Sequence, residues 1–142
     1  MQYLRTLGLL LLGAVTSAFA VDAGGNSCWV KNSDAAGERV WLLCAESRLL
    51  VTEDHGMSWT PRPLPENSQW RAIKFLDSRR GYIAGDKGTL IATTDGGYNW
   101  QPVPLPTTEN LTAIQWKGES GWIAGYGGVI VHTDDGGRNW TL

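Results

Sequence analysis

The sequence lacks a cationic excess, a metal-ligand pattern and any apolar run long enough to cross a membrane. Its 142 residues include 12 lysines and arginines against 14 aspartates and glutamates, for a formal net charge of −2. The absence of a basic patch or tail argues against nucleic-acid binding. The two histidines, His55 and His132, have no Cys or His partner at ligand spacing, so we predict no metal and no cofactor.

The first twenty residues have the layout of a secretory signal peptide. Arg5 precedes an apolar run from Leu7 to Ala14, and the segment ends in the small-x-small pattern Ala18-Phe19-Ala20. The apolar run is shorter than the roughly 20 residues of a transmembrane helix. We therefore expect cleavage after Ala20, no remaining membrane anchor, and export of residues 21–142 to the periplasm or the cell exterior. In a photosynthetic host the thylakoid lumen would be the equivalent destination.

One short pattern, Thr-x-Asp-x-Gly-x-x-Trp, occurs three times, in "VTEDHGMSW", "TTDGGYNW" and "HTDDGGRNW". The copies are about 40 residues apart, a period typical of propeller blades. The match extends upstream, because "GYIAGDKGTLIATTD" aligns without gaps with "GWIAGYGGVIVHTDD". The first copy, "VWLLCAESRLLVTED", is more divergent. The chain therefore contains three copies of one unit.

Each unit has the pattern of short strands rather than helices. In the second unit, strands are expected near residues 72–75, 82–85 and 90–93, and "GDKG" predicts a two-residue hairpin turn. A fourth strand is expected in "WQPVPLP", whose prolines confine it to a sheet edge. Four antiparallel strands in each repeat predict an all-β, propeller-type fold. The expected blades are residues 28–64, 65–106 and 107–142.

Each copy of the pattern predicts a stapled turn between the third and fourth strands. The Thr and Asp side chains are expected to bond backbone N–H groups, the Gly to supply a positive φ, and the Trp to fold back over the hairpin. Catalytic groups usually occur once in a protein rather than in every repeat. We therefore interpret these residues as structural and assign no catalytic residue. The turn residues are Thr52, Asp54, Gly56, Trp59, Thr93, Asp95, Gly97, Trp100, Thr133, Asp135, Gly137 and Trp140.

The three turns resemble the Asp-box of bacterial neuraminidase repeats. The longer units "GYIAGDKGTLIATTDGGYNW" and "GWIAGYGGVIVHTDDGGRNW" resemble the photosystem II assembly and stability factor family. The resemblance covers nearly all of Cys28 to Trp140. It implies a seven-bladed propeller that follows a signal peptide, whereas this chain has three units. A sialidase would need an arginine cluster and a Tyr nucleophile with a Glu partner, but the arginines here share no register, so no enzyme is predicted.

Cys28 and Cys44 are the only cysteines, and both lie in the portion expected to be exported. An oxidising compartment favours their pairing. Folding the first hairpin near Ala36 places them on neighbouring strands. We therefore predict a disulfide.

One end of the blades is expected to carry a recognition surface. In propellers, the loops between blades and between the second and third strands share one face, and here these loops vary while the strands do not. We predict a protein partner, for a scaffold that assists assembly of a membrane or envelope complex. Plain solvated loops, and a carbohydrate-binding or degenerate sialidase-like module, remain alternatives. The predicted face comprises Glu46, Arg48, Asp86, Lys87 and Tyr126, with segments 65–69 and 107–111.

Three units cannot close a ring, because propellers have about four to eight blades. An open arc would expose apolar side chains on its first and third blades. Two explanations remain open. Two copies could join head to tail, or the sequence could be part of a longer propeller, which the short segment after Trp140 favours.

Overall fold

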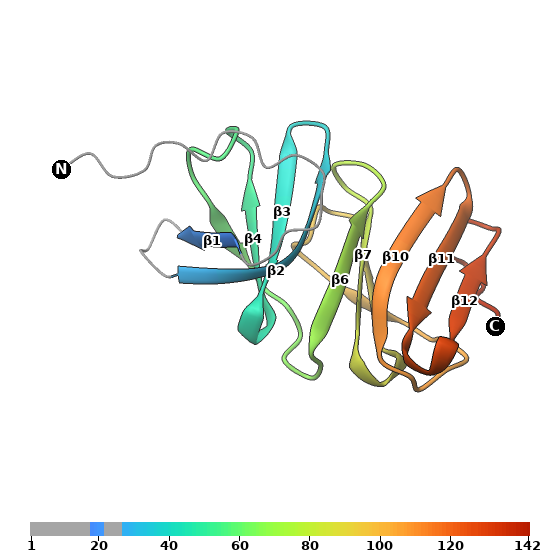
Figure 1. The fold of residues 1–142 in the computed structure, drawn as a ribbon. Helices are drawn as coiled ribbons and strands as arrows, with labels where there is room; N and C mark the ends of the chain where they lie inside the picture. The colour runs from blue at the N-terminus through green and yellow to red at the C-terminus, as the bar shows by residue number, and fades with distance from the viewer. Residues whose placement is uncertain (1–17, 22–26) are drawn as a thin grey trace.

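The computed structural model describes residues 18–21 and 27–142, which form β-strands and short 3-10 turns (Figure 1). Residues 1–17, most of the predicted signal peptide, lie outside the described residues. The predicted cleavage point, Ala20, falls inside a short strand, Ala18–Val21, that pairs with residues 27–30. The signal peptide therefore stays a prediction. No helix in the described part of the chain is long and apolar enough to cross a membrane.

Three antiparallel sheets follow one another along the chain, and their strands pair in chain order. The first blade contains β1 (Ala18–Val21), β2 (Ser27–Ala36), β3 (Arg39–Cys44), β4 (Arg48–Thr52) and β5 (Thr60–Arg62). The second contains β6 (Trp70–Phe75), β7 (Gly81–Gly85), β8 (Leu90–Thr93) and β9 (Gln101–Val103). The third contains β10 (Leu111–Lys117), β11 (Ser120–Gly125) and β12 (Ile130–Thr133). The predicted all-β, propeller-type blades in an open arc are confirmed.

The strand content of the blades differs from the prediction at three places. The first sheet gains β1 and starts before residue 28. The predicted fourth strand of the second blade stops at Val103, where Pro104 has no N–H to continue the ladder. In the third blade, the fourth strand is reduced to a bridge between His132 and Thr141.

The three blades share one register. In each blade, the ladder between the second and third strands ends at the buried threonine of the Asp-box. The pairs are Val40–Thr52, Gly81–Thr93 and Gly121–Thr133. In the second and third blades, the second-strand partner of this threonine must be glycine. A Cβ on Gly81 would lie 2.6 Å from the ring of Phe75, and one on Gly121 would lie 2.8 Å from the ring of Trp116. The missing side chain makes space for an aromatic ring on the first strand.

The first and second blades are joined by aromatic packing. Trp41 on β3 stacks on Phe75 on β6 with ring centroids 3.6 Å apart, and Trp100 contacts the edge of Phe75 at 6.2 Å. The indole N–H of Trp41 donates a hydrogen bond to the carbonyl of Gly96, 3.1 Å away in the second Asp-box turn. The side chain of Trp41 is fully buried. One aromatic residue therefore ties its blade to both the first strand and the Asp-box turn of the next.

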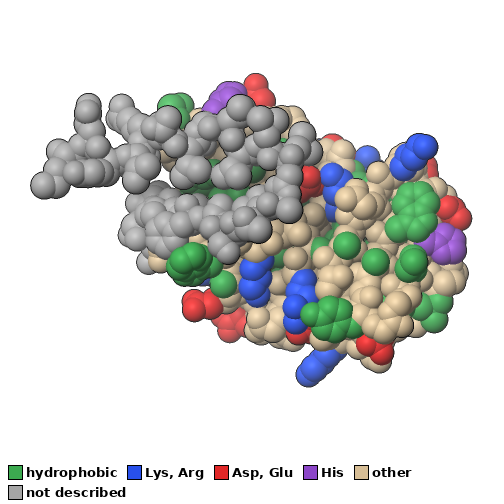
Figure 2. All heavy atoms as spheres, in the orientation of Figure 1, with side chains coloured by type: hydrophobic (Ala, Val, Ile, Leu, Met, Phe, Trp, Pro, Cys, Tyr) green, Lys and Arg blue, Asp and Glu red, His purple; other side chains and the backbone are tan. Residues whose placement is uncertain are grey.

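The same contact recurs between the second and third blades. Tyr82 on β7 stacks on Trp116 on β10 at 5.1 Å, and Trp140 packs edge-on against both rings. The hydroxyl of Tyr82 donates to the carbonyl of Gly136 at 3.2 Å. The blade-to-blade interface thus repeats along with the blade. Hydrophobic side chains are also exposed on the surface of the third blade (right of Figure 2).

A disulfide joins Cys28 and Cys44, whose Cα atoms are 5.4 Å apart on β2 and β3. The bond lies in a small core with Val30 and Leu50, and Trp59 of the first Asp-box packs against it. The first blade therefore has its own apolar cluster, separate from the two interfaces between blades.

Replacing both cysteines with serine should lower the free energy of unfolding by about 3 kcal/mol, because the bond closes a loop with a sequence separation of 16. Urea unfolding of the variant and of the unreduced protein measures this difference. Intact-mass analysis of unreduced, alkylated protein provides the check on pairing. Two alkylated thiols, or equal unfolding free energies, would contradict the prediction.

Candidate protein-binding face and the Asp-box turns

Each Asp-box turn is held by one set of hydrogen bonds, shown most fully in the second blade. The hydroxyl of Thr93 donates to Asp95 at 2.8 Å and accepts the N–H of Gly97 at 3.0 Å. Asp95 accepts the backbone N–H groups of Tyr98 and Asn99 at 3.0 and 2.9 Å, and the Asn99 side-chain amide at 2.8 Å. Gly97 has a φ of +96°, which glycine adopts without a Cβ clash. The carboxylate is therefore fully occupied within its own turn.

The other two turns follow this pattern with one substitution. In the third blade, Asp135 accepts the backbone N–H and the side-chain amide of Asn139 at 2.9 and 2.7 Å. In the first blade, Ser58 replaces the asparagine and donates its hydroxyl to Asp54 at 2.6 Å. The most divergent copy thus keeps the same geometry with a shorter donor.

These hydrogen bonds lower the carboxylate pKa values from 3.8 to about 2. For Asp95 and Asp135, the main cause is the backbone N–H of Asn99 and Asn139, respectively. For Asp54, it is the hydroxyl of Ser58. A general acid needs a raised pKa and an accessible proton. The Asp-box carboxylates have the opposite properties, which fits a structural role.

A hollow of about 770 Å³ lies where the turns between first and second strands meet. Three of its four charged side chains form ion pairs, since Lys74 binds Asp34 at 3.1 Å and Arg80 binds Asp77 at 2.7 Å. In residues 18–21 and 27–142, no cluster of three or more His, Cys, Asp or Glu side chains could hold a metal ion. Most of the charged groups at this hollow therefore interact within the protein.

The stabilisation from the Asp-box carboxylates should depend on pH. Their folded pKa values of about 2 lie below 3.8, so the contribution is complete at neutral pH and is lost as the pH falls from 3.8 towards 2. We expect Asp95→Asn to lower the urea midpoint at pH 7, with the difference from wild type shrinking as the pH approaches 2.

The matched control is Glu38→Gln, which changes an exposed carboxylate outside the Asp-box turns and should behave like wild type at both pH values. A constant difference between Asp95→Asn and wild type from pH 7 to pH 2 would show that the ionised carboxylate does not hold the turn.

The turns between second and third strands lie at the end of the blades opposite the Asp-boxes, as the strand register requires. They are Ala45–Ser47, Asp86–Gly88 and Tyr126–Gly128. Lys87 and Gly88 both have positive φ, +57° and +66°, as a two-residue hairpin turn with matching twist needs. The turn presents the side chain of Lys87 to solvent.

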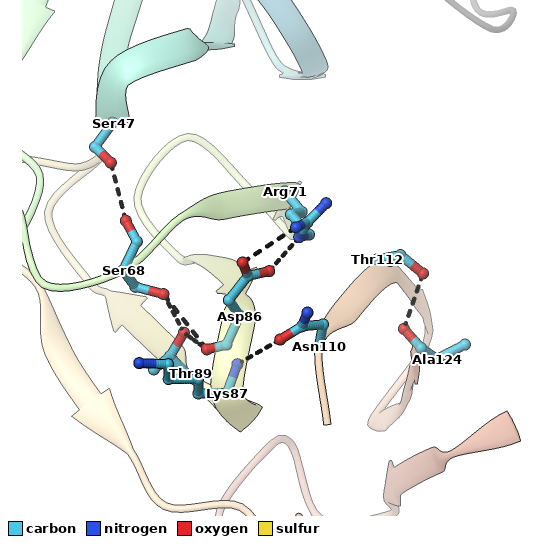
Figure 3. Close-up of polar contacts among 9 residues, drawn as sticks. All are labelled: Ser47, Ser68, Arg71, Asp86, Lys87, Thr89, Asn110, Thr112 and Ala124. Carbon is cyan, nitrogen blue, oxygen red and sulfur yellow. Dashed lines mark hydrogen bonds and ion pairs between the residues drawn. The ribbon is translucent and has the colours of Figure 1, made fainter. Parts of the chain in front are cut away.

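Hydrogen bonds join these turns to the connections between blades (Figure 3). Ser47 donates to the carbonyl of Ser68 at 2.9 Å. The backbone N–H of Lys87 donates to the side chain of Asn110 at 2.9 Å. The backbone N–H of Tyr126 donates to the Asn110 carbonyl at 2.8 Å. Loops from all three blades therefore form one continuous strip with a fixed backbone.

At the centre of this strip, Arg71 forms a two-pronged ion pair with Asp86 (Figure 3), one prong of which, Nη2 to Oδ2, measures 3.1 Å. The side-chain hydrogen bond from Arg71 lowers the pKa of Asp86. Arg71 also lies over the ring of Tyr126, with its Cζ 5.7 Å from the ring centroid. We refer to Arg71, Asp86, Lys87 and Tyr126 as the basic–aromatic cluster.

The predicted face residues thus divide into two groups. Asp86, Lys87 and Tyr126 lie together across the second and third blades, and the carboxylate of Asp86 is engaged by Arg71 rather than presented to a partner. Glu46 is exposed on the first-blade turn, and Arg48 donates to the carbonyl of Ser27 at 2.9 Å. Arg71 was missed by the sequence reasoning. A bulge between residues 70 and 72 sets its position, and Thr112 takes its place in the third blade.

The open arc of antiparallel blades, with Asp-box turns at one end and a loop strip at the other, defines a propeller-repeat protein of the Asp-box class. A family model described as "Photosynthesis system II assembly factor YCF48" matches residues 58–142, and the chain belongs to this family. No curated protein matches the chain.

Two solved structures are similar to the chain. A structure of YCF48 bound to a D1 peptide superposes with a TM-score of 0.72 and 24% identity, over 92% of this chain and 44% of that one. YCF48 from Cyanidioschyzon merolae superposes with a TM-score of 0.66 and 22% identity, over 80% and 39%. At these identities the likeness shows the fold. The chain spans less than half the length of either solved chain.

Proposed function

We propose that this chain is an exported, non-enzymatic scaffold that binds a peptide segment of a partner protein through the basic–aromatic cluster. In this role it would serve as an assembly or stability factor for a membrane or envelope complex. Membership of the YCF48 family supports the proposal, as does the D1 peptide bound to the similar solved protein. The disulfide supports export, because such bonds persist in oxidising compartments.

The observation that carries the proposal is the cluster itself. Lys87 and Tyr126 are exposed on turns whose backbones are fixed, and Tyr126 is 54% exposed beside Arg71. Cations and an aromatic ring on a fixed backbone suit a peptide that carries a carboxylate next to an apolar side chain. Fixed loops lose little conformational entropy on binding.

Substituting Lys87→Glu and Tyr126→Ala together should leave the fold intact and reduce recovery of the partner roughly tenfold or more, since one cation and one exposed ring are removed. Recovery is measured by affinity purification from detergent-solubilised membranes of the native host, followed by mass spectrometry of the captured proteins.

The matched control is Lys117→Glu with Tyr98→Ala, which removes an exposed lysine and an exposed tyrosine away from the cluster. It should recover the partner like wild type. Equal recovery by both double variants would refute the assigned face. Saturable binding on a glycan array, unchanged by the Lys87 and Tyr126 substitutions, would instead favour a carbohydrate-binding module.

A further inference from the structure

Arg62 is a buried cation at a position where the next blade has an apolar side chain. It lies on β5 and pairs with Leu49, and at the equivalent place in the second blade Val103 pairs with Leu90. Val103 packs against the core between the second and third blades. The side chain of Arg62 is only 8% exposed. A charged group at this depth lowers stability unless polar groups around it replace its lost hydration.

The described chain leaves much of this guanidinium without a hydrogen-bond acceptor. Nε of Arg62 is buried and has no hydrogen-bond partner among the described residues. Its ion-pair contact with Glu53, from Nη2 to Oε1, is 3.8 Å long, which is beyond the range of a hydrogen bond. That same oxygen lies 2.9 Å from Nε of Arg39. Because a guanidinium can donate five hydrogen bonds, Arg62 has donors left for an acceptor from outside the chain.

Arg62 lines a hollow of about 280 Å³, most of whose wall belongs to the first blade. Thr60, two residues earlier on β5, also lines it, because alternate residues of a strand share a face. Tyr98, from the second Asp-box turn, lines it from the second blade, and Cζ of Arg62 lies 3.8 Å from the centre of its ring. Stacking on the ring fixes the plane of the guanidinium and leaves the N–H groups at its edge to bind a ligand.

The charges around the hollow favour a ligand with one negative charge. Glu53 is ion-paired with Arg39, and Asp54 accepts the backbone N–H and the hydroxyl of Ser58 at 2.8 and 2.6 Å within its own turn. Both carboxylates line the hollow, so a doubly charged anion is repelled more strongly than a singly charged one. A carboxylate carries one charge, and its two oxygens match the edge of a guanidinium.

We infer that Arg62 binds the carboxylate of a small organic acid in this hollow, with Tyr98 as the stacking platform and Thr60 as a neighbouring polar group. The volume lies just below the roughly 300–1,000 Å³ of pockets for drug-sized ligands, which favours a small acid. The site is at the Asp-box end of the blades, opposite the basic–aromatic cluster. It therefore requires neither the peptide nor the partner protein of the proposed function.

An NMR titration of the ¹⁵N-labelled chain with sodium acetate, at constant ionic strength, tests the site. The Nε–H resonance of Arg62 and the backbone amide of Tyr98 should shift and saturate together. Acetamide, the neutral analogue, should cause no saturable shift, and sulfate should bind more weakly than acetate. An equal response to acetamide, tighter binding of sulfate, or no saturation with acetate would overturn the inference.

Variants separate this site from general anion binding. Arg62→Gln should abolish the saturable shift of the Tyr98 amide, and circular dichroism checks that the variant folds. The matched control is Arg138→Gln, which removes an exposed arginine at the place of Tyr98 in the third Asp-box turn. It should titrate like wild type, and loss of acetate binding in this control would contradict the assignment to Arg62.

Glu53→Gln distinguishes a ligand site from an ion pair within the protein. If Arg62 serves an external acid, removal of the nearby negative charge should lower the dissociation constant of acetate about threefold or more. If Glu53 is instead the true partner of Arg62, Glu53→Gln should lower the urea midpoint as much as Arg62→Gln does, and acetate should not bind more tightly. That result would overturn the inference.

Discussion

The structure depends on an aromatic side chain that crosses from each blade to the Asp-box turn of the next. Trp41 and Tyr82 each donate to a glycine carbonyl in that turn while stacking on a first-strand ring. The carbonyl is held in place because Asp95 and Asp135 bind the N–H groups of the same turns. The Asp-box therefore fixes its own hairpin and also supplies the surface on which the preceding blade packs. The same turn residues therefore determine both the local turn geometry and the packing between blades.

The two ends of the blades therefore differ in their polar groups. At the Asp-box end, the carboxylates and hydroxyls of the turns form hydrogen bonds within their own turns. At the other end, the hairpin turns need only a left-handed backbone, and their side chains are free to differ between Lys87 and Gly127 at equivalent places. Hydrogen bonds through Asn110 hold that varied strip in position. Loops whose side chains differ between blades, while their backbone is held in place by a constant scaffold, are suited to recognising a partner.

The sequence predicted the parts of the fold that repeat. The Thr-x-Asp-x-Gly-x-x-Trp copies located the turns, and period-two patterning located the strands. It did not predict the bond from Trp41 to Gly96, because the two residues are 55 positions apart and belong to different units. The ion pair of Arg71 with Asp86 was missed because a bulge, invisible in the pattern, sets the position of Arg71. Strand β1 was missed because its residues matched a signal peptide.

The central claim is that the stacked aromatics join the blades energetically, and a double-mutant cycle on Trp41 and Phe75 tests it most directly. Unfolding free energies are measured for wild type, Trp41→Leu, Phe75→Leu and the double variant. With ring centroids 3.6 Å apart, the account predicts a coupling energy of about 0.5–1.5 kcal/mol. A coupling energy indistinguishable from zero, with all four proteins folded, would contradict it.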